Sequence, residues 1–105
     1  MAKTQKFESF EDLIAQTKTP LLVDFFATWC GPCRMMGPIL QQVQTLQKGR
    51  LQVAKIDTDK YPAIAGRFDV HALPTVILFK NGEPVHRIEG VQPAENIIQQ
   101  ISPFL

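Results

Sequence analysis

The stretch LLVDFFATWCGPC, residues 21–33, carries an apolar run directly into both cysteines of the chain. Residues 21–27 are apolar at odd and even positions alike, with one exception, which is typical of a strand buried on both faces. From Cys33 onward, apolar residues recur at helical spacing as far as Leu46. The sequence therefore predicts a buried strand that delivers Cys30 to the start of a long helix.

The other segments alternate between strand and helix patterns, without repeats or low-complexity stretches. We expect the order strand, helix, strand, helix, strand, helix, hairpin and helix, which is typical of a mixed sheet covered by helices on both faces. A chain of 105 residues with 45% hydrophobic residues fits a single domain, residues 1–105. The predicted segments are a helix over about 9–18, a strand over 51–56, a short helix containing Ile64 and Phe68, a hairpin over 75–89 that turns at Asn81-Gly82, and a helix from Pro93.

Charge and hydropathy exclude several kinds of partner. The 11 basic and 10 acidic side chains give a net charge of +1 without any block of like charge, so we expect no nucleic acid partner. The longest apolar run, residues 76–79, is far shorter than the ~20 residues of a membrane helix, so we expect no membrane partner. Residues 1–18 resemble neither a signal peptide nor a transit peptide. These features predict a protein that is cytoplasmic or already processed.

Several roles for the two cysteines can be compared. A disulfide loop this short would restrain little of the unfolded chain, so a structural role explains the pair poorly. A zinc site needs two more ligands, and His71 and His86 do not have the short spacing of zinc fingers. An iron–sulfur cluster needs four cysteines, which only a dimer could supply. Because both metal alternatives lack ligands, we expect no metal. Inert buried cysteines conflict with Gly31-Pro32 between them and with the helix start, so we favour redox exchange.

The predicted position of Cys30 favours its thiolate. At the start of a helix its sulfur lies beside unpaired backbone N–H groups and the positive end of the helix dipole. The thiolate is the nucleophile of disulfide exchange, and Cys33, one turn further, lies within reach to resolve the mixed disulfide. We therefore expect the Cys30 sulfur to be ionised at neutral pH and open to solvent, and the pair to act as a two-electron switch.

Four motifs spread along the chain recur together in one known family. They are WCGPC after Val-Asp-Phe, Pro38, Leu73-Pro74-Thr75 before a strand, and Phe79-Lys80-Asn81-Gly82 in the hairpin. With them, essentially the whole chain resembles thioredoxin, and residues 55–62 and 82–84 resemble more particularly the y-type thioredoxins of chloroplasts and cyanobacteria. The resemblance implies an α/β thioredoxin fold, with a central mixed five-stranded sheet flanked by four helices. It also implies a protein-disulfide reductase that maintains redox homeostasis through a redox-active Cys30–Cys33 disulfide, with no bound cofactor.

The resemblance also assigns roles to other residues. Asp24 interrupts the apolar strand, and burial there should raise its pKa unless another group pairs with it. From the residues alone, Asp24 could equally bond a strand end or a loop, and Lys55 would be an outward-facing strand lysine. The resemblance implies that Asp24, with Lys55 nearby, takes the proton of Cys33, and that Pro74 is cis and faces the sulfurs. The implied substrate groove contains Trp29, Gly31, Pro32, Leu73, Pro74, Thr75, Gly90 and Val91.

Two other functions stay open at this point. One is an oxidising or isomerising relative, although Gly31-Pro32 between the cysteines, with no histidine there, favours a reductant. The other is a non-catalytic binding or chaperone-like module that uses the same surface. The resemblance implies two kinds of partner, target proteins with disulfides and a thioredoxin reductase that depends on ferredoxin or NADPH. We expect a monomer, in the cytoplasm or, for a processed plastid protein, in the chloroplast stroma.

Three further side chains fall outside these assigned roles. Phe26 stands where many thioredoxins have a second tryptophan or a tyrosine, so Trp29 is the only tryptophan of the chain. His71 precedes the predicted substrate loop and is a candidate for tuning the choice of partner. His86 falls in the predicted edge hairpin, where we expect it to be solvated.

Overall fold

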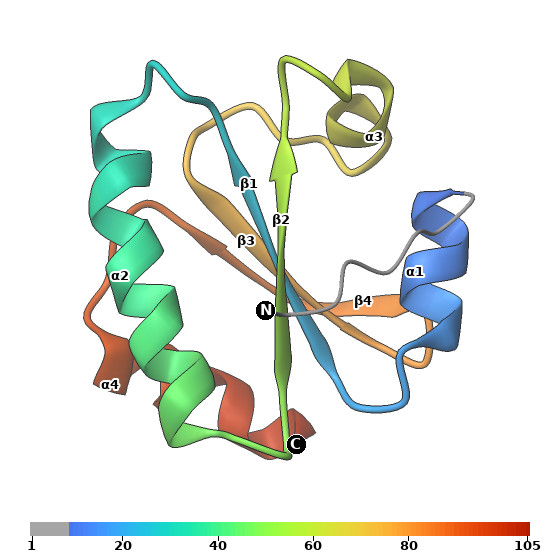
Figure 1. Ribbon diagram of the computed structural model, residues 1–105, viewed down its shortest axis with the longest axis vertical. Helices are drawn as coiled ribbons and strands as arrows, with labels where there is room; N and C mark the ends of the chain where they lie inside the picture. Colours follow the sequence, from blue (N-terminus) through green and yellow to red (C-terminus); the bar gives the residue numbers. More distant parts are fainter. Residues whose placement is uncertain (1–8) are drawn as a thin grey trace, which may run out of the picture.

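The structure, a computed structural model, describes residues 9–105 and shows an α/β fold in which helices cover both faces of one sheet (Figure 1). Strands and helices alternate until a closing hairpin and helix. In chain order the elements are α1 (Phe10–Gln16), β1 (Leu21–Phe26), α2 (Gly31–Leu46), β2 (Gln52–Asp57), α3 (Pro62–Arg67), β3 (Thr75–Lys80), β4 (Glu83–Glu89), α4 (Ala94–Ile101) and the 3₁₀-helix η1 (Ser102–Phe104).

The sheet is mixed, with the strand order β2-β1-β3-β4. β1 runs parallel to β2 and antiparallel to β3, and β3 pairs antiparallel with β4. Because β1 has a neighbouring strand on each side and helices over both faces, its residues from Leu21 to Phe25 are all buried. The sequence prediction of a strand buried on both faces is therefore confirmed.

The expected number of strands needs a correction. The sheet has four strands within residues 9–105, not five, because only four segments of this part carry a strand pattern. The strand expected ahead of the first helix falls outside the described residues. The predicted hairpin is confirmed, and it turns at Asn81 and Gly82, whose φ angles of 55° and 81° suit a tight two-residue turn. Over the same described range, none of the helices combines the length and the apolar character needed to span a bilayer.

Two apolar clusters hold the helices against the sheet. Between the sheet and helices α2 and α4, the cluster includes Leu22, Met36 and Ile97. On the opposite face, Phe10 of α1 and Phe79 of β3 both meet the ring of Phe68 edge to face, at centroid distances of 5.5 and 5.2 Å. Packing on both faces fixes β1 relative to α2, and thereby fixes the loop between them that carries the cysteine motif.

Helix α1 begins at a side-chain cap. The Oγ atom of Ser9 accepts a hydrogen bond of 3.1 Å from the backbone N–H of Asp12. We expect Ser9→Ala to lower the free energy of unfolding by about 1 kcal/mol, because the N–H loses its acceptor. Urea denaturation measures this change. Ser9→Asp keeps an acceptor and should retain the stability of the parent, whereas an alanine variant of undiminished stability would contradict a contribution from the cap.

Candidate active site

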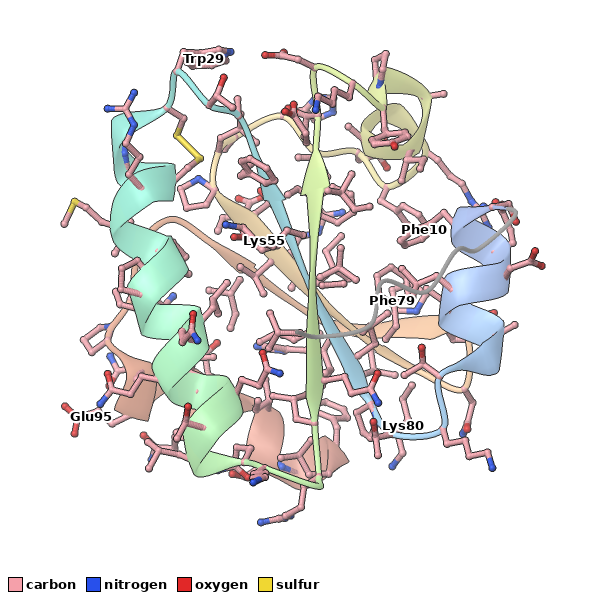
Figure 2. The ribbon with its side chains drawn as sticks, in the orientation of Figure 1. Phe10, Trp29, Lys55, Phe79, Lys80 and Glu95 are labelled. Carbon is pink, nitrogen blue, oxygen red and sulfur yellow. A yellow bond between two sulfur atoms is a disulfide. The ribbon has the colours of Figure 1, made fainter. Side chains whose placement is uncertain are left out.

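The two cysteines lie at the start of α2, just after the loop that follows β1. Cys30 is the N-cap residue of α2, and it forms a disulfide with Cys33, the two Cα atoms lying 5.3 Å apart (Figure 2). The backbone N–H of Cys33 donates a hydrogen bond of 3.2 Å to the Sγ atom of Cys30. Pro32 sits in the first turn, where a helix leaves its N–H groups unpaired and proline is tolerated. The predicted delivery of Cys30 to a helix start is thus confirmed.

The Cys30 sulfur is less open to solvent than its position at a helix start predicts. Cys30 and Cys33 each keep only 5% of their surface exposed. Both cysteines belong to a small buried cluster with Ala27, against which Phe26 and Leu73 pack. Cys30 still lines a groove of about 490 Å³ on the surface.

The groove in front of Cys30 contains four of the predicted substrate-binding residues. They are Trp29, Gly31, Pro32 and Leu73. Trp29 is 67% exposed, and its indole N–H donates a hydrogen bond of 2.9 Å to a carboxylate oxygen of Asp59, which keeps the ring beside the cysteines (Figure 2). An exposed apolar ring beside a reactive sulfur gives this groove a surface suited to a protein partner.

Asp24 lies deep in the sheet on the other side of the cysteine pair. Its side chain is 0% exposed, and neither carboxylate oxygen has a hydrogen-bond partner among the described residues. Burial raises the pKa of Asp24 to about 6, and the positive charge of Lys55, its neighbour in register on β2, opposes that rise. Asp24, Lys55 and Cys33 line a second groove of about 660 Å³. The predicted raised pKa is confirmed, and the three residues come together.

Comparison with known proteins decides the family. The family model for thioredoxin matches residues 1–103. The chain belongs to the thioredoxin family. It is 54% identical to a thioredoxin-like protein of Synechocystis over the full length of both chains. It is 55% identical to thioredoxin Y, chloroplastic, of Oryza sativa and 54% identical to thioredoxin Y1, chloroplastic, of Arabidopsis thaliana, each over 104 residues. The chain spans 62% and 60% of the length of these two plant relatives.

Family and geometry together give the activity. Thioredoxins are protein-disulfide oxidoreductases, and this chain carries their Cys-x-x-Cys pair as a disulfide at the start of α2. It is therefore a redox-active protein-disulfide reductase whose electrons reside in Cys30 and Cys33. Thioredoxins act on disulfides of target proteins and are returned to the dithiol form by a thioredoxin reductase.

The remaining predicted binding residues of this thioredoxin, Pro74, Thr75, Gly90 and Val91, are not among the residues that line the groove. The Leu73–Pro74 bond is cis, as the resemblance implies, and the buried Pro74 accepts a hydrogen bond of 2.9 Å from the backbone N–H of Gly90. The side chain of Thr75 is 0% exposed and donates a hydrogen bond of 2.6 Å to the carbonyl of Ala72. Val91 is half-buried and packs against the core between the sheet and α4. The side chains of Thr75 and Val91 therefore support the loop rather than line the groove.

Three residues of the thioredoxin groove were not predicted as binding residues. Thr58, Val70 and His71 line it together with Trp29 and Cys30. The position of Thr58 in the sequence could have indicated it. Thr58 directly follows β2, the cysteine motif follows β1, and parallel strands end at the same edge of a sheet. No sequence pattern pointed to Val70. His71, which the sequence analysis considered only as a modulator of partner choice, is exposed and belongs to the groove wall.

Proposed function

We propose that Cys30 attacks the disulfide of a target protein and that Cys33 resolves the product. In the first step the Cys30 thiolate forms a bond to one target sulfur, the target S–S bond breaks, and the other target sulfur leaves as a thiolate. In the second step Cys33 attacks Cys30, the bond to the target breaks, and a disulfide closes between the two cysteines. The observation that carries this order is the Cys33 N–H directed at the Cys30 Sγ at a helix start, which favours the Cys30 thiolate.

Asp24 has the properties of a proton acceptor for the second step. Cys33 becomes a nucleophile only when it loses its proton, and it lines the same groove as Asp24. With a pKa of about 6, Asp24 is a carboxylate at neutral pH and is a stronger base than an ordinary carboxylate. We assign to Lys55 the task of stabilising that carboxylate from the groove entrance, since its charge lowers the pKa of Asp24.

The groove in front of Cys30 supplies the binding surface for a target segment. Trp29, Gly31, Pro32 and Leu73 offer apolar contacts on its walls. Pro74 and Thr75 contribute through the backbone, because both side chains are buried. Gly90, with a φ of 86° that suits glycine, donates to the Pro74 carbonyl, and Gly90 and Val91 thus hold the loop in place.

The function is tested by reduction of insulin disulfides with dithiothreitol as electron source. We expect turnover far above that of dithiothreitol alone. An equilibrium titration against glutathione then separates a reductant from an oxidising relative, because a reductant has a potential of about −270 mV, typical of thioredoxins, and protein disulfide isomerase one of about −180 mV. A potential close to the isomerase value would contradict the reductase.

A ferredoxin-dependent reductase is the electron donor that we favour over an NADPH-dependent one. The support is the likeness to plant relatives named chloroplastic, which also favours the chloroplast stroma for a processed plastid protein, with the cytoplasm as the other location. A relative from Mycobacterium leprae, 44% identical over 89% of this chain, is named a bifunctional thioredoxin reductase/thioredoxin, which supports a reductase partner in general. Offering the oxidised chain to each reductase and counting free thiols tests the choice, and reduction by the NADPH enzyme alone would contradict it.

We also propose that residues 1–105 form one domain and that the chain is a monomer. One sheet carries both apolar clusters, which favours a single domain. The net charge of +1 and a groove suited to transient contacts favour the monomer. Light scattering after gel filtration checks it, and a mass of twice 11.8 kDa would contradict it.

A further inference from the structure

The ammonium group of Lys55 lies over an aromatic ring. Its Nζ atom is 4.9 Å from the centroid of the Phe26 ring. The face of an aromatic ring carries partial negative charge and attracts a cation within about 6 Å. Phe26 is the last residue of β1, and its half-buried ring also packs against the cysteine cluster. The ring therefore has a fixed position beside the active site and can hold a flexible lysine.

This contact places Lys55 across the second groove. The Nζ atom lies 3.9 Å from the place where a Cβ atom on Gly37 of α2 would be, so the side chain reaches from β2 toward α2 (Figure 2). The ion pairs within residues 9–105 join Arg67 to Glu11 and Arg87 to Glu89, and neither involves Lys55. Since a lysine has a flexible four-carbon stem, an exposed Lys55 without the ring would spend much of its time in solvent.

We propose that Phe26 is a positioning residue, which holds the Lys55 ammonium over the groove shared by Asp24 and Cys33 and thereby regulates proton transfer from Cys33 to Asp24. This inference rests on the proposed role of Asp24 as proton acceptor. The proton leaves the Cys33 sulfur and arrives on an Asp24 oxygen, and no other reactant is consumed. Phe26 touches neither target nor proton and acts through Lys55.

The charges around Asp24 make Lys55 the effective partner. Two positively charged side chains line the groove with Asp24 and Cys33: Arg34 from α2 and Lys55 from β2. The charge that lowers the pKa of Asp24 is that of Lys55. On β3, the register partner of Asp24 is the buried, uncharged Val76. Lys55 lowers the pKa of Asp24 against the effect of burial, so its release into solvent raises that pKa. A higher pKa leaves less carboxylate to accept the proton at a pH near 6.

Phe26→Leu removes the ring face while it keeps an apolar side chain. We expect the pKa of Asp24, followed by carboxyl carbon NMR in the reduced protein, to rise by a few tenths of a pH unit. The resolving step, followed as release of a preformed mixed disulfide with Cys30, should slow most clearly near pH 6, where the carboxylate fraction of Asp24 is most sensitive to its pKa, and should recover at higher pH. Phe26→Tyr keeps a ring face and should restore both values. Phe26→Met replaces the leucine variant if that variant does not fold.

A double-variant comparison separates the ring from general packing. Lys55→Met should raise the pKa of Asp24 by more than Phe26→Leu does, and adding Phe26→Leu to Lys55→Met should change nothing further. An equal shift from Phe26→Leu in the absence of Lys55 would overturn the proposal, and so would an unshifted pKa in the single variant. A shifted pKa with an unchanged resolving rate would also overturn it, and would locate the failure in the proton-acceptor role of Asp24 rather than in the contact with Lys55.

Discussion

Cys33→Ser should convert the protein into a trap for its targets. The variant retains Cys30 at the start of α2, so it can still attack a target disulfide and form the mixed disulfide. It lacks the second sulfur, and a serine hydroxyl does not resolve a disulfide. We expect insulin reduction to fall to the rate of dithiothreitol alone, while covalent adducts with target proteins accumulate. Non-reducing electrophoresis and mass spectrometry of the adduct measure the result.

Cys30→Ser is the matched control for the trapping variant. It also loses turnover entirely, but it should form few adducts, because Cys33 lines the groove with Asp24 rather than the one with Trp29. Its thiol also lacks the N-cap position and the N–H donor that favour a thiolate at Cys30. Equal trapping by the two variants would contradict the assignment of attacker and resolver.

The sequence predicted those features that depend on neighbours along the chain. The doubly apolar run before the cysteines indicated the central strand, and helical spacing after Cys33 indicated α2. A carboxylate inside an apolar strand indicated a raised pKa at Asp24 from burial alone. Local pattern was enough in each case because residues close in sequence signal strand burial, helix start and desolvation, although distant elements provide the burial itself.

The sequence did not predict features that depend on segments brought together by the fold. Cys30 is nearly buried in a cluster with Ala27 and Cys33, against which Leu73 packs from a segment distant in sequence. The burial of Thr75 follows from its place in central strand β3, and its hydroxyl finds a partner only in the turned backbone at Ala72. The contact of Lys55 with Phe26 requires the parallel register of β1 and β2, which a single sequence does not state.

Asp24→Asn should change how the stability of the oxidised protein depends on pH. The carboxyl has an ordinary pKa of 3.8 and a pKa of about 6 in the folded protein, so the folded state binds this proton more tightly than the unfolded state. The contribution of Asp24 to the free energy of unfolding of the parent is therefore greatest below pH 3.8. It is lost as the pH rises through 6. A shift of about two units corresponds to about 3 kcal/mol. Asparagine does not titrate and escapes this loss.

The measurement is the free energy of unfolding by urea, for parent and variant, between about pH 4 and pH 8. We expect the stability of Asp24→Asn relative to the parent to increase by about 2.5 kcal/mol across that range, which is most of the full difference. Asp24→Ala, which removes the same titrating group without leaving a buried amide, should show the same change with pH from a different starting value. Parallel pH curves for parent and variants would contradict a raised pKa at Asp24.

The same variant separates the chemical role of Asp24 from its cost in stability. If Asp24 takes the proton of Cys33, resolution of a mixed disulfide in the parent should accelerate as the pH rises through about 6, where the acceptor becomes a carboxylate. In Asp24→Asn that rise should disappear, and resolution should be slow at neutral pH and depend on hydroxide. A retained inflection near pH 6 in the variant would assign it to another group. Burial without a partner makes the Asp24 carboxylate unfavourable for the folded state and also makes it a stronger base. As the pH rises, the variant should therefore gain stability relative to the parent and at the same time resolve the mixed disulfide more slowly than the parent.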